Sequence, residues 1–207
     1  MFPSDETVAA DASEAGSALS RAQIRALGRY KEVLEAKGLP LGLISRSDSK
    51  RIYERHLMDS LRAAQAFGPE DASAYDFGSG AGLPGIVLAI ARPQCRFFLV
   101  DSGRRRVAFL EYAVEALGLS NAVPVLSRVQ DLMDPADVVV ARAFAPLSRT
   151  WPVAAPLLST GGRLVYFGGA SMKDPVREGR LAAERGDRSA QVEVVANGSP
   201  LVIMTAS

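Results

Sequence analysis

The residues of this chain that are best suited to chemistry gather at positions 75–85, where one carboxylate precedes a series of glycines. The glycines that follow Asp76 are Gly78, Gly80, Gly82 and Gly85. Glycine lets the backbone adopt positive φ angles and approach a ligand more closely than a side chain would allow. An apolar run at 86–90 predicts a helix whose free N–H groups point into the same turn. The stretch therefore predicts a turn that binds a nucleotide or a nucleoside.

Two overlapping glycine patterns in this turn predict different ligands. Gly80, Gly82 and Gly85 match G-x-G-x-x-G, the dinucleotide fingerprint. Asp101 follows about twenty residues later, where a ribose-binding acid belongs. Read from Asp76, the pattern D-x-G-x-G-x-G instead suits S-adenosylmethionine, whose cationic methionyl part favours a nearby carboxylate. Asp101 then accepts hydrogen bonds from the ribose hydroxyls. In a third interpretation the glycines serve only a tight turn.

The composition is typical of a soluble, cytoplasmic domain. With 207 residues, of which 48% are hydrophobic, the chain can bury one sizeable core. Its longest apolar run, at 86–91, is too short to cross a membrane, and its N-terminus does not resemble a signal peptide. The single cysteine, Cys95, excludes an internal disulfide and offers no cysteine cluster for a metal. We therefore expect one domain over 1–207 without a bound metal; the sequence leaves the oligomeric state open, and we favour a monomer.

The charge distribution says more about partners than the net charge of +1 does. Residues 1–19 carry four acids and no base, whereas residues 20–62 carry ten Lys and Arg against five Asp and Glu. A second basic cluster is Arg104-Arg105-Arg106. Such surfaces can neutralise the phosphates of RNA, although charged runs also coat solvated helix faces. Both interpretations remain open from charge alone.

The first third of the chain predicts helices. Residues 1–17 are acidic and poor in large apolar groups, which predicts a flexible tail. Ser20 and Gln23 form the capping box of a helix that ends at Gly38. A second helix is predicted over 49–67, where apolar residues repeat at helical spacing.

Beyond this helical N-terminal extension (18–68), strands and helices alternate through a body at 69–207. The predicted strands are 74–77, 96–100, 123–127, 137–141 and 162–167, the helices are 83–91, 104–117 and 151–158, and a hairpin joins 191–196 to 201–205 around Asn197-Gly198. This alternation predicts the α/β class, with a doubly wound and mostly parallel sheet. The C-terminal hairpin adds one antiparallel member near the edge of that sheet.

Six short motifs follow one another along the chain in a recognisable order. They are His56-Leu57-Met58-Asp59-Ser60-Leu61, Asp76-Phe77-Gly78-Ser79-Gly80-Ala81-Gly82-Leu83-Pro84-Gly85, Leu99-Val100-Asp101-Ser102, Arg106-Val107-Ala108-Phe109-Leu110, Ser127-Arg128-Val129 and Ala141-Arg142-Ala143-Phe144-Ala145. Over about residues 20–170 the chain thereby resembles the RsmG family, also called glucose-inhibited division protein B. The resemblance implies a class I (Rossmann-like) methyltransferase fold. It also implies S-adenosylmethionine-dependent methylation of guanine N7 at position 527 of 16S rRNA, in the small ribosomal subunit.

The same resemblance implies a set of site residues. By position, the S-adenosylmethionine contacts would be Gly78, Leu83, Val129, Gln130 and Arg142, to which the glycine pattern adds Gly80 and Asp101. The family often has an acid where this chain has Gln130, and an amide can still take part in hydrogen bonding to the adenine. The family commonly reads Lys-Gly where this chain has Gly168-Gly169, so a lysine is missing there unless Lys173 replaces it.

The chemistry agrees with this assignment. Guanine N7 has an exposed lone pair and no proton, so methyl transfer needs in-line placement of N7 rather than a general base. The chain accordingly lacks the Asn/Asp-Pro-Pro-Tyr/Phe motif used on exocyclic amines. Arg142, which leaves a strand where a substrate pocket should form, is the candidate for positioning a phosphate, guanine O6 or the methionine carboxylate. A structural ion pair at the strand end is the alternative for Arg142.

The only histidine, His56, precedes Asp59 by three residues on one helix face. Since N7 methylation needs no acid–base group, we interpret the two as a helix-packing pair that supports the glycine turn. Arg104, Arg105 and Arg106 are better candidates for RNA contact. Two other functions remain open at this point: a nicotinamide-dinucleotide oxidoreductase, and a non-catalytic RNA-binding module that keeps the methyltransferase fold.

Overall fold

A mixed sheet forms the centre of the computed structural model, which describes residues 2–169, 172–186, 188–196 and 198–206. In these residues the sheet has seven strands in the order β3-β2-β1-β4-β5-β7-β6. The strands are β1 Ser73–Phe77, β2 Arg96–Asp101, β3 Ala122–Leu126, β4 Ala136–Arg142, β5 Leu158–Phe167, β6 Ala190–Val195 and β7 Leu201–Ala206. The first five pair in parallel, and β7 runs antiparallel to both β5 and β6. The predicted doubly wound sheet with one antiparallel member is confirmed; Asn197, in the predicted hairpin turn, lies outside the described residues.

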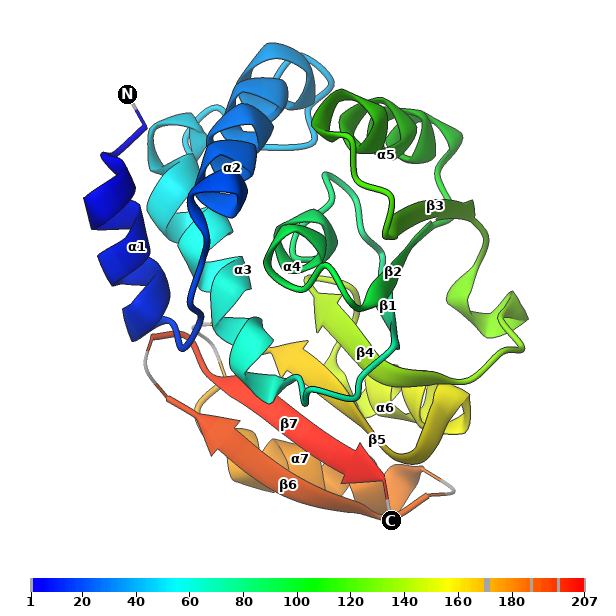
Figure 1. Cartoon of the computed structure of the whole chain (residues 1–207). Helices are drawn as coiled ribbons and strands as arrows, with labels where there is room; N and C mark the ends of the chain where they lie inside the picture. The colour runs from blue at the N-terminus through cyan, green and yellow to red at the C-terminus, as the bar shows by residue number, and fades with distance from the viewer. Residues whose placement is uncertain (1, 170–171, 187, 197, 207) are drawn as a thin grey trace.

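Helices cover both faces of the sheet (Figure 1). Those of the body are α4 Gly85–Ala91, α5 Arg104–Leu117, α6 Leu147–Ala154 and α7 Pro175–Arg185, with short 3-10 segments η5 Val129–Asp131 and η6 Ala155–Leu157. The structure has α5 at the predicted bounds, with Gly118 as its left-handed C-cap. It has α6 beginning at Leu147, before the predicted start at 151. The sequence interpretation omitted α7, although Asp174 caps it and Pro175 occupies its first turn.

The N-terminal segment is folded rather than flexible. Its helices are α1 Asp5–Glu14, α2 Arg21–Val33, η1 Leu34–Gly38, η2 Ser49–Arg51, η3 Ile52–Met58, α3 Asp59–Leu61 and η4 Arg62–Ala66. In α1, Ser4 caps the first turn through its Oγ, while Val8 and Ala12 are fully buried. The prediction of a flexible tail is therefore wrong for residues 5–14. The predicted capping box of Ser20 and Gln23 is confirmed.

Residues 49–66 form one helical segment with changing hydrogen-bond patterns. The segment passes from a 3-10 turn (η2) to a π-helix (η3), then to an α turn (α3) and a second 3-10 turn (η4). The predicted helix over 49–67 is thus present but irregular. Its importance for the site lies in Arg55, His56 and Ser60, whose backbone or side-chain atoms meet the end of β4.

Each face of the sheet has its own hydrophobic core because successive strand side chains point to opposite sides. Along β1, Ala74 packs with the N-terminal helices, α4 and α5, whereas Tyr75 and Phe77 pack with α6 and α7. Asp76 therefore faces the first core, beneath α4. Among the described residues, no helix is long and apolar enough to span a membrane.

Candidate functional site

Two neighbouring cavities open where the parallel strands end. The first has a volume of about 330 Å³ and is bounded by the glycine turn, the end of β2 and the loops after β3 and β4. Five of the predicted cofactor residues line it, namely Gly78, Gly80, Asp101, Val129 and Gln130. These residues come from three different β–α connections, and they meet because the carboxyl ends of parallel strands share one edge of the sheet.

The glycines of the turn divide into two pairs with different roles. Gly78 lies in the left-handed region (φ 67°), and a Cβ on it would lie 2.9 Å from Phe144 Cδ2. Gly78 therefore lets the Phe144 ring rest against the turn at the cavity wall. Gly82 and Gly85 do not line the cavity; a Cβ on Gly82 would lie 2.8 Å from Tyr30 Oη. This second pair allows close packing of α2 and β1 against the turn.

Asp76, buried under α4, stabilises the glycine turn through hydrogen bonds and does not line the first cavity. Its Oδ2 accepts hydrogen bonds from Ser79 Oγ (2.5 Å) and from the Gly85 N–H (3.0 Å). The side chain is 1% exposed, and burial raises the pKa of Asp76 to about 6 despite these two donors. The carboxylate that the glycine pattern associates with a cationic ligand thus lies under the turn and does not line the cavity. Its carboxylate also occupies the N-terminus of α4, the place where a dinucleotide would put its pyrophosphate.

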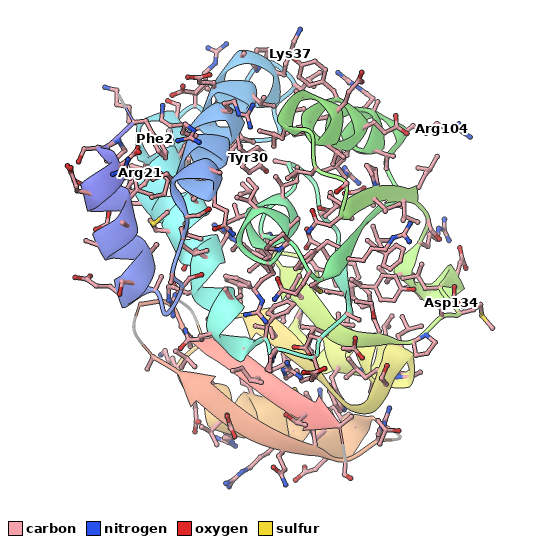
Figure 2. The ribbon with its side chains drawn as sticks, in the orientation of Figure 1. Phe2, Arg21, Tyr30, Lys37, Arg104 and Asp134 are labelled. Carbon is pink, nitrogen blue, oxygen red and sulfur yellow. The ribbon has the colours of Figure 1, made fainter. Side chains whose placement is uncertain are left out.

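Tyr30, on the N-terminal helix α2, packs against the glycine turn and donates a hydrogen bond to it. Its side chain points from α2 toward the centre of the molecule (Figure 2), where Oη donates a 2.5 Å hydrogen bond to the carbonyl of Ala81. Burial, together with the nearby Asp76 carboxylate, raises the pKa of Tyr30 well above its ordinary value. The hydroxyl therefore stays protonated and remains a donor. The helical extension thus contributes directly to the shape of the glycine turn.

Asp101 is the carboxylate that faces the first cavity. Its Oδ2 accepts from the Gly80 N–H (3.0 Å), and its Oδ1 accepts from the Gly103 N–H (2.8 Å) and from Arg106 Nε (2.7 Å). A carboxylate offers about four acceptor positions, so Oδ2 can still accept a hydroxyl. Arg106, one of the candidates for RNA contact, pairs with Asp101 and lines this cavity.

Two predicted cofactor residues lie elsewhere. Leu83 is partly buried against the core on the N-terminal side of the sheet and does not line the first cavity. Arg142 lines the second cavity instead of the first. The sequence interpretation also gave no role to Phe144, which lines both cavities and packs on Phe77 with 5.6 Å between ring centroids. Its position two residues beyond the strand-end Arg142 was the available signal.

The second cavity, of about 970 Å³, lies between the first part of the helical segment 49–66, with Asp48 before it, and the ends of β4 and β5. It shares Ala143 and Phe144 with the first cavity, so the two spaces meet at the loop after β4. Ala143 has a φ of 52°, a left-handed conformation that is uncommon for alanine. Backbone strain of this kind often accompanies a functional constraint, which suits its place between the two cavities.

Arg142 ties the end of β4 to the N-terminal helical segment. Its guanidinium donates to the carbonyl of Arg55 (2.9 Å) and to Ser60 Oγ (3.0 Å), and it lies 3.6 Å from Asp59 Oδ2. Its side chain is 17% exposed, and the ring of Phe167 lies beneath it. The donors of Arg142 are thus engaged mainly by protein groups. This arrangement makes Arg142 a positioning residue that shapes the second cavity.

His56 is held neutral by the same interaction. Arg142 Nη2 lies 3.1 Å from His56 Nδ1, and because a guanidinium only donates, Nδ1 must accept and the proton lies on Nε2. Burial and the Arg142 cation lower the pKa of His56. The expected pairing of His56 with Asp59 is wrong: Nε2 lies 4.0 Å from Asp48 Oδ2, whereas Asp59 pairs with Arg62 and Arg142.

Gly168, where the family commonly has lysine, is tightly packed against its neighbours. Gly168 and Gly169 line the second cavity, and a Cβ on Gly168 would lie 2.8 Å from Met172 Sδ and 2.9 Å from Pro200 Cγ. A lysine at that position would displace both neighbours. Lys173 is exposed and does not line the cavity, so it does not take the place of the missing lysine.

The arrangement suits the transfer of a group between two bound molecules. One cavity offers backbone and a carboxylate to a nucleoside, the other can receive a second planar group, and no cluster of metal ligands occurs among the described residues. The strand order with an antiparallel β7 and the position of the first cavity define a class I methyltransferase.

Solved structures with this fold include M. jannaschii TYW2 in complex with AdoMet (TM-score 0.56, 17% identity, 74% of this chain and 75% of that one). A ribosomal protein L11 methylase from Lactobacillus delbrueckii subsp. bulgaricus gives a TM-score of 0.57 at 17% identity, over 72% of this chain and 76% of that one.

The sequence places the chain within one family of this class. The family described as GidB, rRNA small subunit methyltransferase G, matches residues 23–198. A ribosomal RNA small subunit methyltransferase G from Clavibacter sepedonicus is 39% identical over 172 residues, covering 82% of this chain and 80% of the relative. Its counterpart from Methylococcus capsulatus is 38% identical over 184 residues, covering 88% and 84%. The chain therefore belongs to the rRNA small subunit methyltransferase G family, as the six motifs predicted.

Proposed function

We propose that this protein transfers the methyl group of S-adenosylmethionine to guanine N7 in the 16S rRNA of the small ribosomal subunit. The observation that carries the proposal is the meeting of two cavities at Ala143 and Phe144 in a member of this family. The first cavity takes the cofactor and the second takes the base. The target guanine at position 527 follows from the family resemblance, and the cytoplasm follows from an rRNA substrate.

The residues of the first cavity fit S-adenosylmethionine. Gly78 and Gly80 bring bare backbone to the wall, and Asp101 Oδ2 keeps an acceptor position for a ribose hydroxyl. Val129 and Gln130 offer an apolar surface and an amide to the adenine. When bound, the cofactor supplies an electrophilic methyl group. Asp76, buried under α4, serves by fixing the turn rather than by touching the cofactor.

A dinucleotide fits this chain less well. Dinucleotides place their pyrophosphate at a helix N-terminus, and here the Gly85 N–H at that position is already bonded to Asp76. The antiparallel β7 between β5 and β6 also differs from the all-parallel strand order of dinucleotide-binding domains. The oxidoreductase alternative is therefore not favoured.

The protein's contribution to the reaction is placement. Guanine N7 carries no proton to remove, and the one lone pair of neutral His56 that could take a proton, on Nδ1, already accepts from Arg142, so His56 is not a general base here. Arg142 fixes the helical segment 49–66 against the end of β4 and so sets the width of the second cavity. Phe144, which lines both cavities, limits how the base can approach the methyl group. One copy of the chain contains both cavities, which supports action as a monomer.

Exposed arginines on α5 are available for the RNA backbone. Arg104 extends away from the body (Figure 2), and Arg105 is also exposed. Arginine suits phosphate through its forked donors. Both lie at the start of α5, on the same edge of the sheet as the first cavity.

The test uses radiolabelled S-adenosylmethionine and small subunits isolated without the modification. The proposal predicts label in the 16S rRNA, one methyl group per subunit. A non-catalytic RNA-binding module predicts subunit binding without label, and a dinucleotide enzyme predicts binding of a nicotinamide dinucleotide in place of the cofactor. Absence of label with a folded, cofactor-bound protein contradicts the proposal.

A further inference from the structure

The second cavity is lined by four carboxylates that differ in how they are engaged. Asp59 pairs with Arg62 (2.8 Å) and Arg142 (3.6 Å), and Asp48 accepts from Ser45 Oγ (2.7 Å) and lies 3.4 Å from Arg55. Among the described residues, the side-chain carboxylates of Glu54 and Glu178, which also line the cavity, have no hydrogen bond or ion pair. Two carboxylates of this cavity are therefore free to accept from a ligand.

Glu178 lines the second cavity together with the loop where the two cavities meet. It lies in the first turn of α7, which Asp174 caps, and the neighbouring Gly179 is buried against Val192 of β6. Glu178 lines the same cavity as Tyr166, whose pKa is raised by burial and by the Glu178 carboxylate. Tyr166 Oη in turn donates a 3.0 Å hydrogen bond to the carbonyl of Ala145. The Glu178 carboxylate thus lies close enough to Tyr166 to influence it electrostatically, and both line the cavity that the loop carrying Phe144 also lines.

Aromatic rings with a carboxylate at their edge are chemically suited to guanine. An unstacked base is commonly held on aromatic faces and recognised by hydrogen bonds to its Watson–Crick edge. Guanine alone among the four bases has two adjacent donors on that edge, N1–H and N2–H. An ionised carboxylate has two acceptor oxygens and no donor, so it can accept both. Phe144 and Tyr166 line the cavity that Glu178 also lines.

We propose that Glu178 recognises the Watson–Crick edge of the target guanine and so determines the base specificity of the reaction. This inference rests on the proposed function and adds a residue to it. Transfer of a methyl group to N7 leaves positive charge on the base, which makes N1–H a stronger donor. The hydrogen bonds to Glu178 therefore strengthen as the reaction proceeds, and their loss lowers kcat more than it raises KM.

The experiment compares two substrates and two matched variants. Small subunits are reconstituted with 16S rRNA that carries either guanine or inosine, which lacks the N2 amino group, at the target position. Methyl transfer by the full-length wild type, Glu178→Gln and Glu54→Gln is measured as kcat and KM. Glutamine keeps the size of glutamate but offers one acceptor and one donor group, so it cannot accept both guanine N–H groups.

The wild type is expected to prefer guanine to inosine by about tenfold in kcat/KM, the value of one hydrogen bond to a charged group. Glu178→Gln lowers transfer to guanine by about tenfold or more and reduces the guanine preference to roughly twofold. Glu54→Gln keeps the wild-type preference. An unchanged preference in Glu178→Gln, or a loss in Glu54→Gln instead, overturns the inference while the proposed function stands. A folded, cofactor-bound wild type that methylates neither substrate overturns the proposed function itself.

Discussion

Replacing Asp76 with asparagine tests how the glycine turn is built. Burial raises the pKa of Asp76 from its ordinary value of 3.8 to about 6, so the folded protein binds a proton that the unfolded chain releases between these two values. Stability supplied by this group is present at low pH and is lost as the pH rises toward about 6. Each pH unit within that window corresponds to about 1.4 kcal/mol, which gives about 2 to 3 kcal/mol between pH 4 and pH 7.

The asparagine variant does not titrate, so its stability relative to the wild type should rise by about 2 to 3 kcal/mol over the same range. Urea unfolding of both proteins at pH 4, 5, 6 and 7 measures this difference, in which the contributions of the other groups cancel. Ser79→Ala serves as a control. It removes a hydroxyl whose hydrogen bond lowers the pKa of Asp76, so the wild-type slope should extend to higher pH. A stability difference that is independent of pH would refute the buried, raised-pKa carboxylate.

Two further predictions concern the wall of the first cavity at Gly78 and the contact between Arg142 and His56. Gly78→Ala puts a Cβ against Phe144 and should weaken S-adenosylmethionine binding by about tenfold or more in calorimetry. Gly118→Ala, at a similar positive φ with nothing within 4 Å, should cost about 1 kcal/mol of stability and leave binding unchanged; equal binding by the two variants contradicts the role of Gly78. Arg142→Met should raise the pKa of His56, because it removes the nearby cation that lowers it. The chain has one histidine, so its ring signal can be followed by NMR without assignment, and an unchanged pKa would contradict the contact.

The order of strands and most of the helices could be predicted because each carries its own local signal. Apolar runs predict buried parallel strands, and the pairing of Ser20 with Gln23 marks a helix start. The first cavity could be predicted as well, since Gly78, Asp101 and Val129 follow strands whose carboxyl ends meet at one edge. Local signals of this kind do not depend on knowing the tertiary structure.

The helices that were missed bury small residues or few residues. In α1 only Val8 and Ala12 are buried, and in α7 only Gly179 and Ala182, so neither shows the apolar period on which a helix is predicted. Their stability comes from tertiary packing instead.

The direction of individual side chains also required the structure. Successive residues of β1 face opposite sides of the sheet, and this alternation directs the Asp76 side chain under α4. The glycine pattern alone does not reveal that direction. The contact of Arg142 with His56 joins residues far apart in the sequence, so no local pattern contains it. The charge of Arg106 makes it a candidate for RNA contact but does not reveal its ion pair with Asp101, five residues earlier. Charge patterns predict a surface, and the fold decides which charges pair.

The measurement that tests the central claim most directly is the mapping of the methyl group. Unmodified small subunits are incubated with the protein and S-adenosylmethionine that carries an isotopically heavy methyl group, and the 16S rRNA is then digested and sequenced by mass spectrometry. We expect one heavy N7-methylguanine per subunit, at position 527, and none with NAD in place of the cofactor. A methyl group on another atom or another nucleotide, or no methyl group from a folded protein with cofactor bound, would contradict the account.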